Sequence, residues 1–295
     1  MSITVHILNA FSVGPLGGNP AGVVLEADAL TPQQKQSIAA QVGLSETAFV
    51  SASTTASVKV EFFTPTRQIP HCGHATVAAF TQCRSTGRLS QGLHLKESIA
   101  GTLPVQLGEQ SVSLHQPYPV FEVLALPSGL AQRCLQALSL EETALAPGSP
   151  LVVARSSNAF LLVALASEAA LASIRPVMSA IEALSEELGL IGFYPYVLSS
   201  KGTEPEATAR MLAPLYGIPE ESATGTAAGP LGAWLLSGSG EGASCRVHQG
   251  HFMDPPSPSL LQVAVFKPDG DKGEAAWQVR VSGAARHVEA LNVEL

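Results

Sequence analysis

Short apolar runs separated by glycine and proline dominate the hydrophobic pattern of this chain. Many of these runs alternate apolar and polar positions or consist of branched apolar residues, as β-strands do. The clearest predicted strands cover residues 4–8, 22–25, 48–50, 58–63, 103–107, 112–115, 151–153, 160–165 and 261–266. Residues 277–295 are expected to add two short strands around Ser282-Gly283. The pattern therefore predicts a chain rich in strands and turns.

Helical patterns are fewer. Residues 31–42 begin with a Thr-Pro pair, which is typical of a helix N-terminus, and end at Gly43. Residues 178–188 form a second helical pattern that also ends before a glycine. Two further helices, built from small apolar residues, are predicted to start near Gly73 and Gly225. Because these two are apolar on all sides, we expect them to be buried.

The predicted elements occur in matching pairs. FFTPTRQIPHCGHATVAAF (62–80) and MLAPLYGIPEESATGTAAG (211–229) each contain a proline, an Ile-Pro pair and a glycine that opens a buried helix. Each segment also follows a helix, a Gly-Leu pair and a strand. A repeated order of elements indicates a repeated structural unit. We therefore predict two copies of one α+β module, each a curved sheet around a central helix.

The composition is that of a folded, acidic protein. Of the 295 residues, 46% are hydrophobic and 14% are charged, and the formal net charge is −8. Scattered basic residues and only 5% aromatic residues argue against nucleic acid or an anionic membrane surface as a partner. The N-terminus shows no signal-peptide pattern and the four cysteines form no C-x-x-C pair. A cytoplasmic location is therefore expected.

Candidate chemistry gathers at the starts of the two central helices. The first backbone N–H groups of a helix have no partner within the helix and carry partial positive charge. Gly73 and Gly225 would also allow a ligand to approach the backbone closely. If the two modules face each other, both helix starts can bind one carboxylate in a shared cleft. Tight helix packing is the alternative explanation for both glycines.

Polar residues accompany these helix starts. His74 and Thr226 each directly follow one of the two glycines, and Glu221 lies upstream of Thr226. Glu46 lies at an apolar strand entry, where it is either part of a capping arrangement or a buried acid/base whose pKa burial would raise. Asn19 belongs to a Gly-Asn-Pro turn, from which its side chain could also reach a ligand.

The order of the motifs GGNPAGVV, LSETAF, FTPTRQIPHCGHATVAAF, IPEESATGTAAGPLGAWL and VHQGHFM resembles the PhzF phenazine-biosynthesis-like family, within the diaminopimelate-epimerase-like fold. The resemblance covers essentially the whole chain. It implies an α+β fold of two pseudo-symmetric domains, each a barrel-like, mostly antiparallel sheet around a central helix, with the active site in the cleft between them. The first domain is expected to comprise residues 1–120 and 284–295, and the second residues 121–283.

The same resemblance implies an isomerase that moves a proton by acid/base chemistry, without metal or cofactor, on a small cyclic or amino carboxylic acid. Homodimers are common in the family, so a homodimer is the candidate assembly. By its place in the motifs, Glu46 corresponds to the acid/base residue, His74 to the active-site histidine and Thr226 to a hydroxyl that contacts the ligand. The amides of Gly73 and Gly225 would bind the carboxylate of the substrate.

Two positions depart from the family pattern. Glu221 stands where aspartate is usual, and Pro255, in QGHFMDPPS, stands where arginine is usual. The extra methylene of Glu221 moves its carboxylate by about a bond length, which can alter the choice of substrate. Pro255 removes a charge that would anchor the substrate. These changes argue against the phenazine substrate itself and leave open a small-molecule binding protein with lost or altered catalysis.

A further alternative is an amino-acid epimerase of the two-cysteine type on the same fold. Such an enzyme places one thiol at each helix start, so that one removes a proton while the other returns it. Cys72 precedes the first helix start, but Thr224 occupies the matching position at the second. The hydroxyl of Thr224 is far too weak an acid for this role. A packing role is therefore expected for Cys72.

The last alternative is a zinc site that uses two H-x-x-H pairs, His71 with His74 and His248 with His251. The predicted helix start interrupts a common face for the first pair. No carboxylate accompanies either pair at close spacing in the sequence. We therefore predict neither a metal site nor a cofactor.

Overall fold

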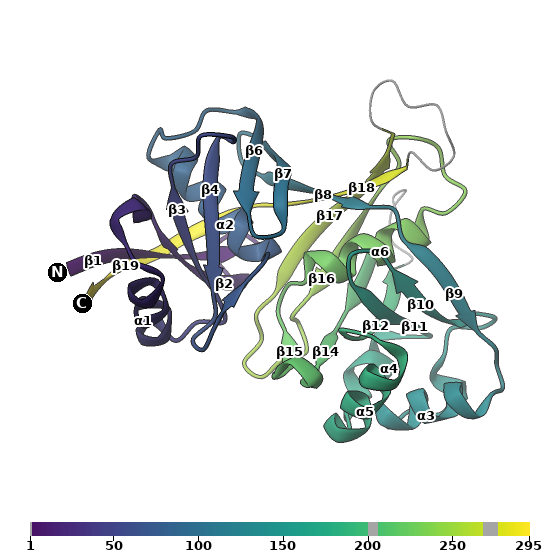
Figure 1. Cartoon of the computed structure of the whole chain (residues 1–295). Coiled ribbons are helices and arrows are strands. Elements are labelled where there is room, and N and C mark those ends of the chain that lie inside the picture. The colour runs from purple at the N-terminus through teal and green to yellow at the C-terminus, as the bar shows by residue number, and fades with distance from the viewer. Residues whose placement is uncertain (1, 200–205, 268–276) are drawn as a thin grey trace. The chain divides into compact units, whose positions relative to one another are not determined.

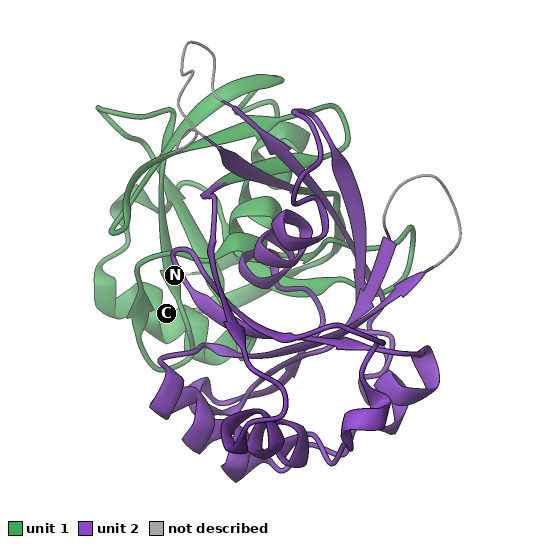
Figure 2. Ribbon diagram, turned by 90° about the vertical axis from the view of Figure 1, so that its right-hand side faces the viewer, with its two compact units in different colours: residues 1–115, 282–295 green, residues 116–281 purple. Residues whose placement is uncertain are grey.

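The computed structural model describes residues 2–199, 206–267 and 277–295. The chain divides into two compact units, unit 1 with residues 1–115 and 282–295 and unit 2 with residues 116–281 (Figures 1 and 2). It passes from unit 1 to unit 2 within strand β8 (Val112–Pro117) and returns within β18 (Gln278–Gly283).

Unit 1 is a curved sheet with a helix packed against its strands. Its other strands are β1 (Ser2–Ala10), β2 (Asn19–Val24), β3 (Thr47–Ser51), β4 (Val58–Phe63), β5 (Gln68–Ile69), β6 (Gly92–Ser98), β7 (Gly101–Leu107) and β19 (Ala285–Glu294). Its helices are η1 (Ala27–Ala29), α1 (Pro32–Val42) and α2 (Gly73–Ser85). Helix α2 contacts β1, β2, β3 and β19 and is the central helix of this unit (Figure 1).

Two parallel strand pairs interrupt the otherwise antiparallel sheet of unit 1. Strand β2 runs parallel to β3, and β4 runs parallel to β6. Parallel neighbours need a crossover connection, and the crossovers contain α1 between β2 and β3 and α2 between β4 and β6. This topology places Glu46, the residue before β3, and the start of α2 in the same unit.

Unit 2 contains the remaining elements. Its strands are β9 (Val120–Leu124), β10 (Leu151–Arg155), β11 (Ala159–Leu165), β12 (Gly192–Ser199), β13 (Glu206–Ala209), β14 (Met211–Ala213), β15 (Ile218–Glu221), β16 (Ser244–Gln249) and β17 (Ser259–Phe266). Its helices are α3 (Gly129–Ala137), η2 (Glu142–Ala144), α4 (Glu168–Ser173), α5 (Met178–Leu188), η3 (Pro214–Tyr216) and α6 (Gly225–Leu235).

Unit 2 repeats the topology of unit 1. Strand β11 runs parallel to β12, with α4 and α5 in the crossover, and β13 runs parallel to β16, with α6 in the crossover. Helix α6 contacts β10, β11, β16 and β17, so it is the central helix of this unit. The central helices begin at Gly73 and Gly225, as the sequence predicts. The repeated α+β module inferred from the sequence is thus confirmed.

Local sequence signals account for the surface helices. The predicted helix over residues 31–42 forms as α1, where Thr31 and Gln34 build a capping box. Gly43 ends this helix with φ 70°, a left-handed conformation that glycine adopts readily. The predicted helix over residues 178–188 forms as α5 with the same bounds. Helix α3, which was not predicted, starts after Ser128, whose hydroxyl caps it.

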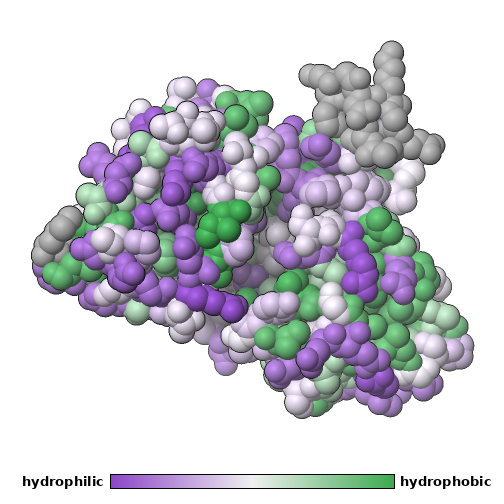
Figure 3. Space-filling view, in the orientation of Figure 1, coloured by the Kyte–Doolittle hydropathy of each residue, from purple (hydrophilic) through white to green (hydrophobic). Residues whose placement is uncertain are grey.

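Each unit has a core of its own. Branched and aromatic side chains of the strands pack against the helices, with Phe49 and Ile38 buried in unit 1 and Phe193 and Leu161 buried in unit 2. On the face shown in Figure 3, hydrophobic residues lie interspersed among hydrophilic ones. Among the described residues, no helix has the length and apolarity to cross a membrane.

A close strand contact in unit 1 is expected to depend on Gly22. A Cβ atom built on this residue would lie 2.8 Å from Oγ1 of Thr47, a fully buried side chain. We therefore expect Gly22→Ala to lower the free energy of unfolding by about 1–3 kcal/mol, measured by chemical denaturation. Gly129→Ala is the matched control, because a Cβ on Gly129 meets nothing within 4 Å. Equal stability of the two variants would contradict this account.

Candidate active site

Strand pairing positions Glu46 in unit 1. Glu46 directly precedes β3, and its backbone carbonyl accepts a hydrogen bond of 3.0 Å from the amide of Gly22 on β2. The missing side chain of Gly22 lets β2 approach Thr47 closely. The contact between the strands therefore fixes the backbone from which the Glu46 side chain extends.

The start of α2 positions His74. Cys72 takes the N-cap position with an extended backbone, and His74 is the second residue of the helix. Both the amide and the hydroxyl of Thr76 donate to the carbonyl of Cys72, at 3.1 and 2.6 Å. A Cβ on Gly73 would meet only Leu114, at 3.7 Å, so packing does not require a glycine there. The open space leaves the backbone of this helix start available to a ligand.

The structure brings Glu46, His74 and Asn19 together. Oε2 of Glu46 lies 3.1 Å from Nε2 of His74, an ion-pair distance, although no hydrogen bond to this buried oxygen is well aligned. Nδ1 of His74 lies 3.2 Å from the amide nitrogen of Asn19. Asn19 follows Gly18, whose φ of +92° favours glycine. Three residues that the sequence selected therefore form one cluster, in which Asn19 and His74 are buried and Glu46 is largely buried.

The charges of Glu46 and His74 stabilise each other. Burial raises the pKa of Glu46, but the contact with His74 outweighs burial and holds the pKa below its usual value. Burial likewise lowers the pKa of His74, but the sulfur of Cys72 and the carboxylate of Glu46 raise it well above its usual value. The predicted rise in the pKa of Glu46 is therefore wrong, because a neighbouring cation dominates over desolvation. At neutral pH the two residues form a carboxylate–imidazolium pair.

Cys72 completes the cluster, and the sequence had assigned it only to packing. Its Sγ lies 3.5 Å from Nδ1 of His74. Burial, followed by the charge of Glu46, raises the pKa of the Cys72 thiol. The thiol therefore stays protonated near neutral pH, and Glu46 is the anion that holds the proton on His74. A protonated, buried thiol is a poor nucleophile.

The same three side chains are the donors that could hold a metal ion. Among the described residues, Glu46, Cys72 and His74 form the only group of such donors within 4.8 Å of one another. The carboxylate of Glu46 is distant from His74 in the sequence, so the spacing did not predict their contact, which the fold creates. A metal would have to displace the protons of the imidazolium and the thiol. We therefore do not assign these residues as metal ligands.

The other histidines of the two H-x-x-H pairs have different partners. His71 accepts a hydrogen bond from Lys96 instead of joining His74. His248 binds Glu206, and its ring lies 5.8 Å from the ring of His251. Among the described residues, His71, His248 and His251 belong to no group of three donors at metal-binding distance.

Unit 2 contains a hydrogen-bond network around the start of α6. The hydroxyl of Thr224 donates to the carboxylate of Glu221. The fully buried Gln249 donates to the hydroxyl of Thr224 at 3.0 Å and to the backbone carbonyl of Glu221 at 2.7 Å. Its side-chain oxygen accepts from the hydroxyl of Tyr194 at 2.7 Å and from the amide of Thr224 at 3.2 Å. Glu221 is therefore held beside the predicted helix start.

Thr226 and Pro255 take no part in this network. Thr226 is half-buried, and its hydroxyl forms no hydrogen bond to another described residue. Pro255 is exposed. Gln249 and Tyr194 are the residues of this network that sequence reasoning missed. The motif QGHFM could have indicated a role for Gln249. Nothing in the sequence predicts that Gln249 contacts Tyr194.

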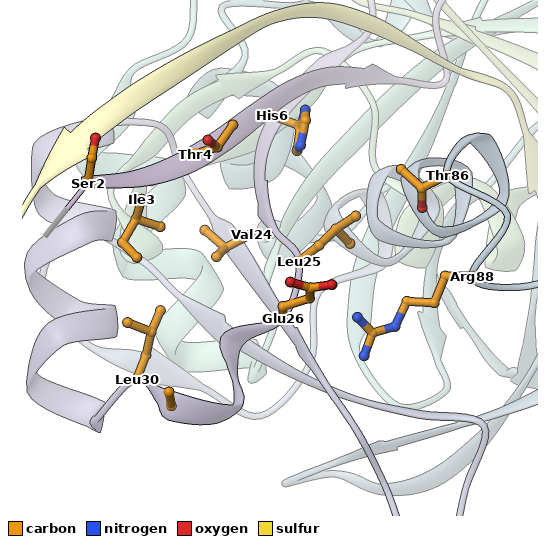
Figure 4. Close-up of a pocket in the computed structure, with 11 residues that line it drawn as sticks. Ser2, Ile3, Thr4, His6, Val24, Leu25, Glu26, Leu30, Thr86 and Arg88 are labelled. Atoms are coloured by element: carbon orange, nitrogen blue, oxygen red, sulfur yellow. The ribbon is translucent and has the colours of Figure 1, made fainter.

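A cavity of about 610 Å³ in unit 1 lies apart from these residues. It is lined by β1, by the end of β2 with the following loop, and by the loop after α2, and Figure 4 shows His6, Glu26 and Arg88 around it. None of the candidate residues lines this cavity. The case for a functional site therefore rests on the Glu46–His74 cluster and not on cavity size.

Comparison with known sequences identifies relatives of this chain. A family model described as phenazine biosynthesis-like protein matches residues 8–290. An uncharacterized isomerase from Deinococcus radiodurans is 36% identical over 288 residues, which cover 94% of this chain and 90% of that protein. Trans-2,3-dihydro-3-hydroxyanthranilate isomerase from Pseudomonas aeruginosa is 29% identical over 236 residues, which cover 78% of each chain. The resemblance seen in the motifs is confirmed.

Solved structures agree on the fold. The crystal structure of a Bacillus anthracis phenazine biosynthesis protein of the PhzF family has a TM-score of 0.89 at 26% identity and covers all of both chains. A hydroxyproline epimerase from Agrobacterium vitis has a TM-score of 0.59 at 13% identity and covers 100% of this chain and 93% of its own. The predicted α+β, epimerase-like fold class is therefore confirmed.

The ion pair predicts an unusual titration for His74. We expect NMR titration of its imidazole to give a pKa well above 6.5 in the parent protein. Glu46→Gln removes the anion, so burial should dominate and lower the pKa of His74. Glu109→Gln, at an exposed position in the same unit, should leave it unchanged. A His74 pKa that does not respond to Glu46→Gln would contradict the pairing.

Proposed function

Since the chain belongs to the phenazine biosynthesis-like (PhzF) family and is an isomerase, we propose that it shifts a proton within a small cyclic or amino carboxylic acid. The reaction would proceed by general acid/base catalysis without metal or cofactor. The observation that carries this proposal is the buried pair of Glu46 and His74, with 3.1 Å between Oε2 and Nε2.

Glu46 is the proposed proton shuttle. Its lowered pKa keeps the carboxylate ionised at neutral pH, so that it can accept a proton from a carbon of the substrate. The C–H bond breaks, the double bond of the substrate moves, and Glu46 returns the proton to another carbon. The neighbouring imidazolium of His74 stabilises the carboxylate before and after this cycle. Asn19 lies beside Nδ1 of His74, and with its amide turned so that Oδ1 faces the ring it would accept a hydrogen bond from the imidazolium.

The helix starts are proposed to bind the carboxylate of the substrate. The first backbone amides of α2, at Gly73, and of α6, at Gly225, have no acceptor within their own helix and lie at its positive end, and neither N-cap side chain forms a capping hydrogen bond. Thr226 offers a hydroxyl that no described residue engages. Glu221, held by Thr224, would orient a polar group of the substrate.

Substrate choice is the finer part of this proposal. The relative from Pseudomonas aeruginosa is named for trans-2,3-dihydro-3-hydroxyanthranilate. In this chain, Glu221 and the exposed Pro255 replace the residues usual in the family. We propose a related carboxylic acid with different polar groups, and the named compound is the first one to test. Location in the cytoplasm and assembly as a homodimer stay predictions from the sequence.

The proposed shuttle predicts that Glu46→Gln binds ligand but does not turn it over. Glutamine keeps the shape and a carbonyl acceptor but cannot take up a proton. Loss of a positioned acid/base is expected to lower kcat by about 10²–10⁴-fold. The assay would use trans-2,3-dihydro-3-hydroxyanthranilate and a panel of small cyclic amino acids, with binding measured by calorimetry.

Glu109→Gln is the matched control for this experiment and should retain parental activity. A rate of Glu46→Gln within about threefold of the parent would show that Glu46 is not the shuttle. A parent that binds members of the panel tightly and releases them unchanged would instead favour the binding-protein hypothesis. The two results are distinguishable, because the first requires turnover and the second requires its absence.

The alternative of a cysteine-based epimerase predicts that Cys72 is essential, whereas the proposed function predicts that it is not. Its protonated thiol has no essential part in the proposed reaction, so Cys72→Ser should retain kcat within about tenfold of the parent, against a loss of 10²–10⁴-fold for a removed acid/base. Cys83→Ser, at another buried cysteine of unit 1, controls for effects on packing. If Cys72→Ser abolished turnover while Cys83→Ser did not, the thiol would have to be assigned a catalytic role.

A further inference from the structure

Lys96 on β6 is fully buried, which is unusual for a lysine. Burying an ammonium group is costly unless an opposite charge compensates for it. Lys35, the other buried lysine of unit 1, pairs with the carboxylate of Glu61. No carboxylate of a described residue lies within ion-pair distance of Lys96. The fold therefore retains a buried lysine without a carboxylate partner among the described residues.

Both hydrogen bonds of Lys96 are with residues at the start of α2. Its Nζ donates to Nδ1 of His71 at 2.7 Å and to the hydroxyl of Thr76 at 3.2 Å. It also lies 5.0 Å from the centroid of the Phe62 ring, a cation–π contact. An ammonium group can only donate, so Nδ1 of His71 accepts and the proton of the neutral ring lies on Nε2.

These contacts hold the segment that presents His74. The hydroxyl of Thr76 accepts from Lys96 and donates to the carbonyl of Cys72 at 2.6 Å. His71 lies directly before Cys72 in the chain. Lys96 therefore contacts the chain both before and after the turn into α2, at His71 and at Thr76. His74 lies within that segment, 3.1 Å from the carboxylate of Glu46.

We propose that Lys96 is a positioning residue for proton transfer, which fixes the 71–76 segment through His71 and Thr76 and so sets the place of His74 against Glu46. This inference rests on the function proposed above. A displacement of about 1 Å at such a pair can cost about 10²-fold in rate. On this proposal, Lys96 fixes the geometry of the site. Its burial lowers the stability of the fold.

The titration of Lys96 agrees with such a cost. Burial lowers the pKa of Lys96 to about 7. Burial and the charge of Lys96 lower the pKa of His71 to about 3, so His71 is neutral at neutral pH. His71 and Cys72 are the titratable groups that interact with Lys96. The folded protein therefore binds the lysine proton more weakly than the unfolded chain, whose lysine pKa is about 10.4.

Lys96→Met separates positioning from stability. Methionine fills a similar volume without a charge, so this variant should resist chemical denaturation at least as well as the parent at pH 7. The stability of the parent should rise between about pH 7 and 10, since its unfolded state holds the extra proton, so the advantage of Lys96→Met should shrink over that range. Despite its stability, the variant should lose about 10–10²-fold in kcat.

A second readout requires no substrate. In Lys96→Met, the NMR-measured pKa of His74 should shift from its parental value, because the distance between His74 and Glu46 is no longer fixed. Thr76→Val removes the hydroxyl link and keeps the shape of the side chain, so it should shift the pKa of His74 in the same direction. Lys35→Met is the matched control: it should lose stability, because Glu61 loses its partner, and should leave the pKa of His74 unchanged.

Three results would overturn the positioning role. An unchanged His74 pKa in both Lys96→Met and Thr76→Val would show that the contacts do not set the geometry of the site. Parallel loss of stability and activity in Lys96→Met would indicate an ordinary structural residue. Turnover by Lys96→Met within about twofold of the parent would exclude a contribution to the reaction. The function itself is judged separately, because it fails if Glu46→Gln retains activity or if the parent binds the panel without turnover, and neither result depends on Lys96.

Discussion

The ion pair of Glu46 and His74 is the interaction around which the candidate site of unit 1 is organised. Either charge alone would be expensive at this depth, and each stabilises the other. Two parallel crossovers bring the residue before β3 and the second residue of α2 to this contact. The central helix therefore supplies a cation at its N-terminus, where the helix dipole would by itself disfavour one.

The two units use one topology for different electrostatic purposes. The start of α2 carries titratable groups whose pKa values depend on each other, whereas Gln249 organises the start of α6 through hydrogen bonds. The sequence predicted this repeat because small apolar helices with an opening glycine are distinctive, and α5 because its pattern ends sharply at Gly189. It missed α3, since a short segment with one serine cap has no strong pattern.

The contacts and pKa shifts of the candidate site residues were harder to predict from the sequence than the helices. Glu46 and His74 stood out through family motifs, whereas spacing alone gave no sign that they touch. The pKa of Glu46 was predicted in the wrong direction, because burial can be expected from apolar neighbours in the sequence but a cation 28 residues further along the chain cannot. Lys96 escaped for the same reason, because its partner Thr76 lies on another element of the fold. Cys72 contacts His74 only two residues along the chain, but the sequence pattern did not show that the two side chains touch.

The most direct test of the central claim is a double-mutant cycle on the pair. The variants Glu46→Gln, His74→Asn and their combination would be compared by kcat/KM on one substrate. If the pair acts as a unit, the double variant should be no slower than Glu46→Gln alone, because His74 has no carboxylate left to stabilise. Losses that multiply in the double variant would show that the two residues act independently and would contradict the account.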